Sequence, residues 1–284
     1  MSLEKLPLDP DDQKALGVAA AHLYRLLSAS DKFTQQAADP AAPGSPMEQA
    51  RQDGVRDPFD YSYALIFSAE DHLRTMLTVI KHGPLPSYAL YTLARAAADA
   101  LVRAAYLLEL GISPAERLGR TLNERLDNLD EQRKVGPDLE NHYRQSVAGL
   151  QKKAAAHGVQ LVVNSPKSGA PGKLIGFGTP KKSVTDLFEL FLTGGQPVYR
   201  YLSGYAHSKM WAQLPRSRAE PSPDDPDIAL VSTDLNVQLF TRVLRSVSVL
   251  YDEVLGNWIL LAGYPSDVWR MAKQGVHGPF LGDI

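Results

Sequence analysis

An arginine and a histidine in the segment YRYLSGYAHSKMW, residues 199–211, have the types and spacing that most directly suggest chemistry. Arg200 and His207 lie seven positions apart, so in a helix they share one face with Ser203. A guanidinium binds phosphate through two hydrogen bonds, and an imidazole exchanges protons near neutral pH. The pair would suit metal-free RNA cleavage, with Arg200 holding the phosphodiester and His207 as general acid and base. Alternatively, Arg200 pairs with a carboxylate and His207 packs at a helix end.

A row of charged residues lies in an apolar segment upstream. Arg95, Asp99 and Arg103 are each four residues apart, among residues that are mostly Ala, Leu and Tyr. This spacing aligns the three on one helix face, where ion pairs form between neighbours. Because the segment is so apolar, we expect part of the row to face the interior, where charges need partners and often mark a site. Buried structural pairing and a solvated face are the alternatives.

The segment SAEDHLR, residues 68–74, supplies further candidates. Its acidic residues lie three and four positions before Arg74, which favours local ion pairs. Helical spacing leaves open whether Asp71 or His72 points inward. The sequence therefore predicts one polar site in which the pair on residues 199–211 is assisted by supporting polar residues, namely Asp71, His72, Arg95, Asp99 and Ser203.

Positive charge gathers in one part of the chain, although the formal net charge is only −2. No acidic residue occurs between Glu140 and Asp186, whereas seven basic residues do. A basic loop approaches a phosphate backbone without sequence preference. The candidate nucleic-acid-binding residues are Lys167, Lys173, Lys181 and Lys182. A solubilising loop is the alternative interpretation.

Several chemistries are excluded by residues or motifs that the chain lacks. The absence of cysteine excludes disulfides, thiol catalysis, Fe–S clusters and cysteine-ligated zinc. No His follows a Glu by three positions, as a ferritin-like di-iron bundle requires, and the zinc-protease, serine-hydrolase and phosphate-loop motifs are missing. We therefore expect no metal ligands and no cofactor.

The elements that must position these residues are helices. Apolar stripes, caps and terminal glycines predict helices along most of the chain, for example over 11–30, 61–81, 86–111 and 234–262. The segment 159–182, with β-branched runs around a Gly/Pro-rich centre, predicts a short hairpin or ordered loop, and composition predicts mobile loops near 31–58 and 215–228. The expected fold is a single all-α domain, residues 1–284: a bundle of eight or nine helices with one short inserted hairpin or loop.

The hydropathy of the chain indicates neither a signal peptide nor a membrane-spanning segment. The first residues, MSLEKLPLDPDDQ, lack the apolar stretch of a signal peptide, and no run approaches the roughly 18–20 apolar residues of a membrane span. We expect a soluble protein of the bacterial cytoplasm without a membrane partner.

The segment YRYLSGYAH resembles the Arg-x4–6-His signature of the HEPN superfamily, all-helical domains of prokaryotic toxins, RNA-processing factors and defence systems. The order SAEDHLR, LARAAADALVRAAYLLELG, ERLGR and PVYRYLSGYAHS, over about residues 60–262, is similar to a group of uncharacterised bacterial helical proteins placed near these domains. The resemblance implies an RNase whose catalytic pair is Arg200 and His207, in a site formed where two copies of the helix meet. Tyr201 departs from the family, in which a polar residue often follows the Arg.

Three functions remain open. The first is a HEPN-like, metal-independent endoribonuclease or toxin, with RNA as substrate. The second is a non-catalytic HEPN-like module that binds nucleic acid, a nucleotide or a protein such as an antitoxin. The third is a small-molecule enzyme or receptor whose pocket is lined by Asp71, Arg95, Asp99 and His207. Aromatic residues in 199–211 also favour a homodimer through this segment or the 234–262 helix.

Overall fold

The fold is all-α, as the sequence predicts. The computed structural model describes residues 9–36, 41–164, 172–213, 217–221, 229–233 and 235–274, and these contain eleven α-helices, one short 3₁₀ segment and two small antiparallel sheets. The longer helices are α1 (Pro10–Gln36), α3 (Asp57–His82), α4 (Ala89–Leu107), α5 (Pro114–Gln132), α6 (Glu140–Ala156), α8 (Gly195–Ala206) and α10 (Val237–Leu261). The shorter elements are α2 (Pro46–Gln52), η1 (Pro137–Leu139), α7 (Val184–Phe191), α9 (Met210–Gln213) and α11 (Ser266–Gln274).

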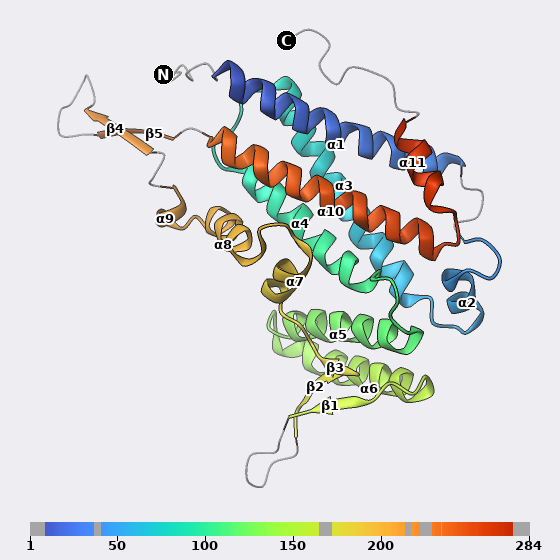
Figure 1. The fold of residues 1–284 in the computed structure, drawn as a ribbon. Helices are drawn as coiled ribbons and strands as arrows, with labels where there is room; N and C mark the ends of the chain where they lie inside the picture. The colour runs from blue at the N-terminus through green and yellow to red at the C-terminus, as the bar shows by residue number, and fades with distance from the viewer. Residues whose placement is uncertain are drawn as a thin grey trace.

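Four long helices, α1, α3, α4 and α10, form the main bundle (Figure 1). Helix α4 packs against α3, α10, α7 and α8, and α11 covers α1 and α10. The Ala-rich sequence of α4 permits this close approach, since Ala94, Ala97, Ala98 and Ala104 are all fully buried. No helix in the described ranges is both long and apolar enough to cross a membrane.

A second hydrophobic cluster joins α5, α6 and a three-stranded sheet below the main bundle (Figure 1). The sheet consists of β1 (Leu161–Val163), β2 (Leu174–Phe177) and β3 (Thr179–Pro180) in that order. Asn123 on α5 anchors it, because its amide group donates to the Phe177 and Thr179 carbonyls and accepts from the Phe177 N–H at 2.7 Å. The hairpin expected within 159–182 is thus present and fastened to α5, while residues 165–171 lie outside the described part.

The two segments expected to be loops contain more regular structure than composition indicated. Residues 31–36 complete α1, and α2 occupies 46–52 because Ser45 caps the Glu48 N–H at 3.2 Å and Met47 is buried. In the other segment β4 (Ser217–Pro221) pairs with β5 (Ala229–Thr233), a strand pair that was not expected. Residues 37–40, 214–216 and 222–228 lie outside the described ranges.

Glycine at position 204 is required by close helix packing. A Cβ added there would lie 2.8 Å from Ala212 Cβ and 2.9 Å from the Trp211 ring, whereas one at Gly149 on α6 would meet nothing within 4 Å. We expect Gly204→Ala to lower the free energy of unfolding by about 1–3 kcal/mol through overpacking. Gly149→Ala should raise it by about 1 kcal/mol, because alanine favours a helix interior. Urea denaturation checks both, and a neutral Gly204→Ala would contradict the packing.

Candidate functional site

The two residues expected to be catalytic both lie on the surface of α8. Arg200 and His207 are exposed, and neither side chain forms a hydrogen bond or ion pair with another described residue. His207 ends the helix, with its backbone N–H donating to the Ser203 carbonyl at 3.0 Å. Ser203 itself is half-buried. The pair is therefore open to solvent rather than enclosed.

The other residues of α8 hold the helix on the bundle. Tyr205 is buried and stacks on Tyr91 of α4, with ring centroids 4.2 Å apart. Tyr201 contacts the edges of the Tyr91 and Trp211 rings. Gly204 faces α9 at close range. Its small size thus permits close packing of α8 against α9.

Arg95 of α4 lies directly beneath α8. Its guanidinium sits 4.1 Å from the centre of the Tyr199 ring and 5.2 Å from that of Phe188. Its Nε and Nη1 are buried without hydrogen-bond partners among the described residues, so the two ring faces take the place of acceptors. Burial alone would raise the pKa of the Tyr199 phenol, but the side chains of Thr185 and Arg95 lower it.

A ladder of charges continues from Arg95 toward α5. Arg95 and Arg103 both bind the Asp99 carboxylate, at 3.2 and 3.0 Å, and Arg103 reaches Glu124 of α5 at 2.5 Å. Burial tends to lower the pKa of Arg103, but the Glu124 and Asp99 carboxylates raise it. The expected row on α4 is thus mainly a structural pairing. No described contact joins Arg95 or Asp99 to Arg200 or His207.

On α3, the acidic residue that points into the bundle differs from the one expected. Asp71 is exposed and His72 is half-buried, and neither contacts the residues of α4 or α8 named above in the described structure. The inward acid is Glu70, whose Oε1 accepts hydrogen bonds from Ser30 at 2.8 Å and from Tyr251. A signal in the sequence identifies it, since Glu70 lies four residues after Ile66 and three before Leu73, within the apolar stripe.

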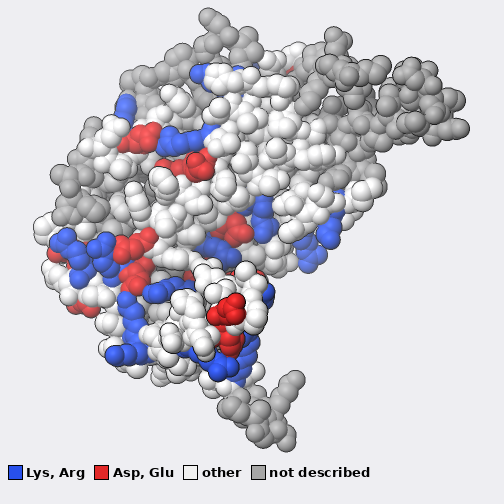
Figure 2. Space-filling view, turned by 180° about the vertical axis from the view of Figure 1, so that it is seen from behind, with Lys and Arg blue, Asp and Glu red and all other residues white. Residues whose placement is uncertain are grey.

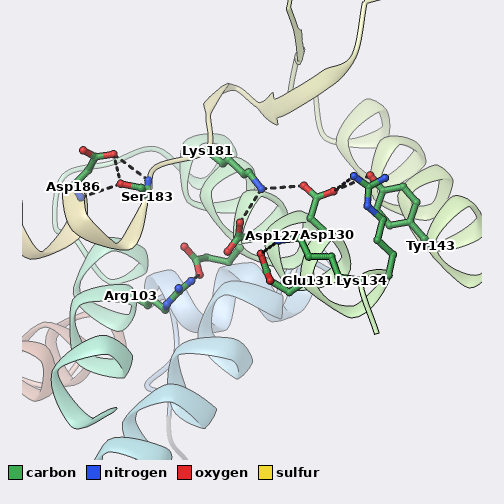
Figure 3. A network of polar contacts seen from close by, with 11 residues as sticks. Arg103, Asp127, Asp130, Glu131, Lys134, Tyr143, Lys181, Ser183 and Asp186 are labelled. Atoms are coloured by element: carbon green, nitrogen blue, oxygen red, sulfur yellow. Dashed lines mark hydrogen bonds and ion pairs between the residues drawn. The ribbon is translucent and has the colours of Figure 1, made fainter. Parts of the chain in front are cut away.

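Lys181, a candidate for binding nucleic acid, is part of an ion network. Its ammonium donates to Asp127 at 2.7 Å and to Asp130 at 2.9 Å, which links the end of the sheet to α5 (Figure 3). Burial tends to raise the pKa of Asp130, but Lys181 lowers it. Lys173 and Lys182 are exposed, and Lys167 lies outside the described residues.

Ion pairs neutralise much of the remaining basic segment. Arg144 pairs with Glu140 at 3.0 Å, and Lys153 pairs with Asp57. On the face shown in Figure 2, basic and acidic residues are intermixed rather than gathered into one basic surface. The charge count along the sequence therefore overstated the local positive potential, because the acidic partners come from outside the counted segment.

Metal binding and similarity to other proteins give no further assignment. The described residues contain no group of three or more His, Asp or Glu placed to hold a metal ion. No family model, curated protein or solved structure matches the chain. The functional argument therefore depends on the geometry of the chain itself.

The Arg103–Glu124 contact provides a test of the ladder. Glu124 is 5% exposed, so Arg103→Met leaves a buried carboxylate without its strongest partner. We expect the free energy of unfolding to fall by about 3–5 kcal/mol. The double variant Arg103→Met/Glu124→Met should recover most of this loss, because it removes both charges. Arg245→Met, at an exposed position on α10, is the control and should change stability by less than about 0.5 kcal/mol. Equal stabilities of the single and double variants would contradict the pairing.

Proposed function

We propose that this protein is a HEPN-like endoribonuclease or toxin that cleaves RNA without a metal ion through Arg200 and His207. The observation that supports the proposal is that both side chains are exposed on α8 and unpaired among the described residues. An RNA strand reaches such a surface directly. A small-molecule enzyme built on His207 would instead require an enclosed site.

The chemistry assigns one role to each residue. Arg200 binds the scissile phosphodiester through two N–H groups and offsets its charge. His207 withdraws the proton of the ribose 2′-hydroxyl, whose oxygen attacks phosphorus. As the bond to the 5′-oxygen breaks, the imidazolium returns its proton to that oxygen. The products are a 2′,3′-cyclic phosphate and a 5′-hydroxyl.

Exposed basic side chains supply further candidate contacts to an RNA strand. Lys173 and Lys182 are exposed and remain candidates for phosphate contacts, together with Lys167.

The alternative is a non-catalytic HEPN-like module that binds RNA, a nucleotide or a protein through the same surface. It is favoured by one observation, that no side chain in the described ranges orients His207 through a hydrogen bond. Histidines that act as bases are usually oriented by a third group. A cytoplasmic location, where RNA and an antitoxin are present, fits both functions.

RNA cleavage tests the proposal. Labelled single-stranded RNA is incubated with the wild-type protein, with and without EDTA. We expect His207→Ala to lower the cleavage rate by about 10² to 10⁴-fold and Arg200→Ala to lower kcat/KM severely, with cleavage unaffected by the chelator. His82→Ala and Arg270→Ala, at exposed positions on α3 and α11, should cleave as the wild type does. Undiminished cleavage by His207→Ala refutes the nuclease. RNA binding that depends on Arg200, without any cleavage, identifies the binding module.

Self-association provides a second test. Most aromatic residues of α8 are turned into the bundle and most apolar residues of α10 are buried, so Met210 and Trp211 are the exposed pair through which we expect a homodimer. Light scattering should give twice the mass of one chain for the wild type and the mass of one chain for Trp211→Asp. Exposed Val249→Asp on α10 is the control. A wild-type protein that stays monomeric at micromolar concentration contradicts the dimer.

A further inference from the structure

A cavity of about 780 Å³ opens between α1, α2, α3 and α10, at the end of the bundle where α2 lies (Figure 1). None of the residues assigned to RNA cleavage lines it. Its volume is within the range of pockets that hold small organic ligands, roughly 300–1,000 Å³. The cavity is therefore a separate candidate site.

Glu70 supplies a carboxylate to the cavity wall. Its side chain is 15% exposed, and the hydrogen bonds from Ser30 and Tyr251 both go to one oxygen, Oε1. The other oxygen, Oε2, lies 3.6 Å from Arg74, and no described residue donates a hydrogen bond to it. Arg74 instead makes two hydrogen bonds to Asp31, at 2.8 and 3.1 Å. One carboxylate oxygen thus remains able to accept a hydrogen bond.

The charges around the cavity do not balance. Arg56 pairs with Asp60 at 2.8 Å, and Arg51 pairs with Glu48 at 2.7 Å, so these two pairs are neutral. A third set of charged side chains near the cavity consists of the carboxylates of Asp31 and Glu70 and the guanidinium of Arg74. Both carboxylates lie close to this one guanidinium. One negative charge is left over. A ligand with a single positive charge would neutralise it, whereas an anion would be repelled.

Aromatic rings form a large part of the apolar wall. The centroids of Phe33 and Trp258 lie 6.5 Å apart in an edge-to-face arrangement, and those of Tyr63 and Trp258 also lie 6.5 Å apart. Tyr63 and Phe67 are 53% and 66% exposed. Ring faces attract cations and also bury apolar groups, so this wall suits both parts of an amphipathic amine.

We propose that the cavity binds a protonated organic amine with an apolar or aromatic body. The ammonium group donates a hydrogen bond to Glu70 Oε2, and the body packs against Phe33, Tyr63 and Trp258. A neutral apolar molecule fills the same space but leaves the Glu70 charge without a counter-ion. Charge is therefore the property by which the site selects its ligand.

Three probes of similar shape test the charge preference on the wild-type protein, which avoids dependence on any variant. They are 2-phenylethylammonium, 2-phenylethanol and phenylacetate, and binding is followed by calorimetry and by the NMR signal of the Trp258 indole N–H. We expect the ammonium ion to bind at least about tenfold more tightly than the alcohol, since a charge-assisted hydrogen bond is stronger than a neutral one, and the carboxylate to bind most weakly. Equal affinities, tighter binding of the carboxylate, or no binding of the ammonium ion at millimolar concentration would overturn the proposal.

A variant then identifies the carboxylate. Glu70→Gln keeps an oxygen that accepts from Ser30 and Tyr251, so we expect it to fold, which circular dichroism checks. It should lose at least about tenfold in affinity for 2-phenylethylammonium and bind the alcohol as the wild type does. Glu253→Gln removes an exposed acid of α10 and should leave all affinities unchanged. Unchanged ammonium affinity in folded Glu70→Gln would overturn the assignment of Glu70.

Discussion

Burial of α4 is the constraint on which the rest of the structure depends. The helix is covered by α3, α10, α7 and α8, so the three charged residues of its row need partners away from water. The Asp99 carboxylate pairs with both Arg95 and Arg103. The Tyr199 ring covers the Arg95 guanidinium, and Glu124 of α5 pairs with Arg103. The pairing is one of the contacts that join α5 to the main bundle.

Hydrogen bonds at the carboxyl end of α4 also join this helix to α5. Arg117 of α5 donates to the carbonyls of Leu107 and Glu109, and Arg120 donates to that of Tyr106 at 2.7 Å. These carbonyls have no partners within the helix, so the arginines satisfy groups that burial would otherwise leave unpaired. Burial, assisted by Arg120, lowers the pKa of Arg117 to about 10, which still leaves it charged at neutral pH. Polar contacts thus join two hydrophobic clusters that share few apolar residues.

The same packing separates the two candidate sites. Tyr199 and Tyr205 face α4, which leaves Arg200 and His207 on the outer side of α8. On α3, Glu70 faces α1 and α10 and lines the cavity between α1, α2, α3 and α10. The outer side of α8 therefore presents an exposed guanidinium and an exposed imidazole, whereas the cavity wall presents a carboxylate among aromatic rings.

The sequence by itself determined most of the long helices, several of their ends and the ion-pair row of α4, because caps and i,i+4 contacts depend on neighbours along the chain. Ser113 and Ser183 cap α5 and α7, each accepting a hydrogen bond from the backbone N–H three residues later. Only the tertiary structure decided that Arg103 pairs with Glu124, 21 positions away, and Lys181 with Asp130, 51 positions away. It also decided that Gly204 lies in close contact with α9. Such pairings depend on which faces of distant helices meet, and helical periodicity fixes the face of a residue but not the element that covers it.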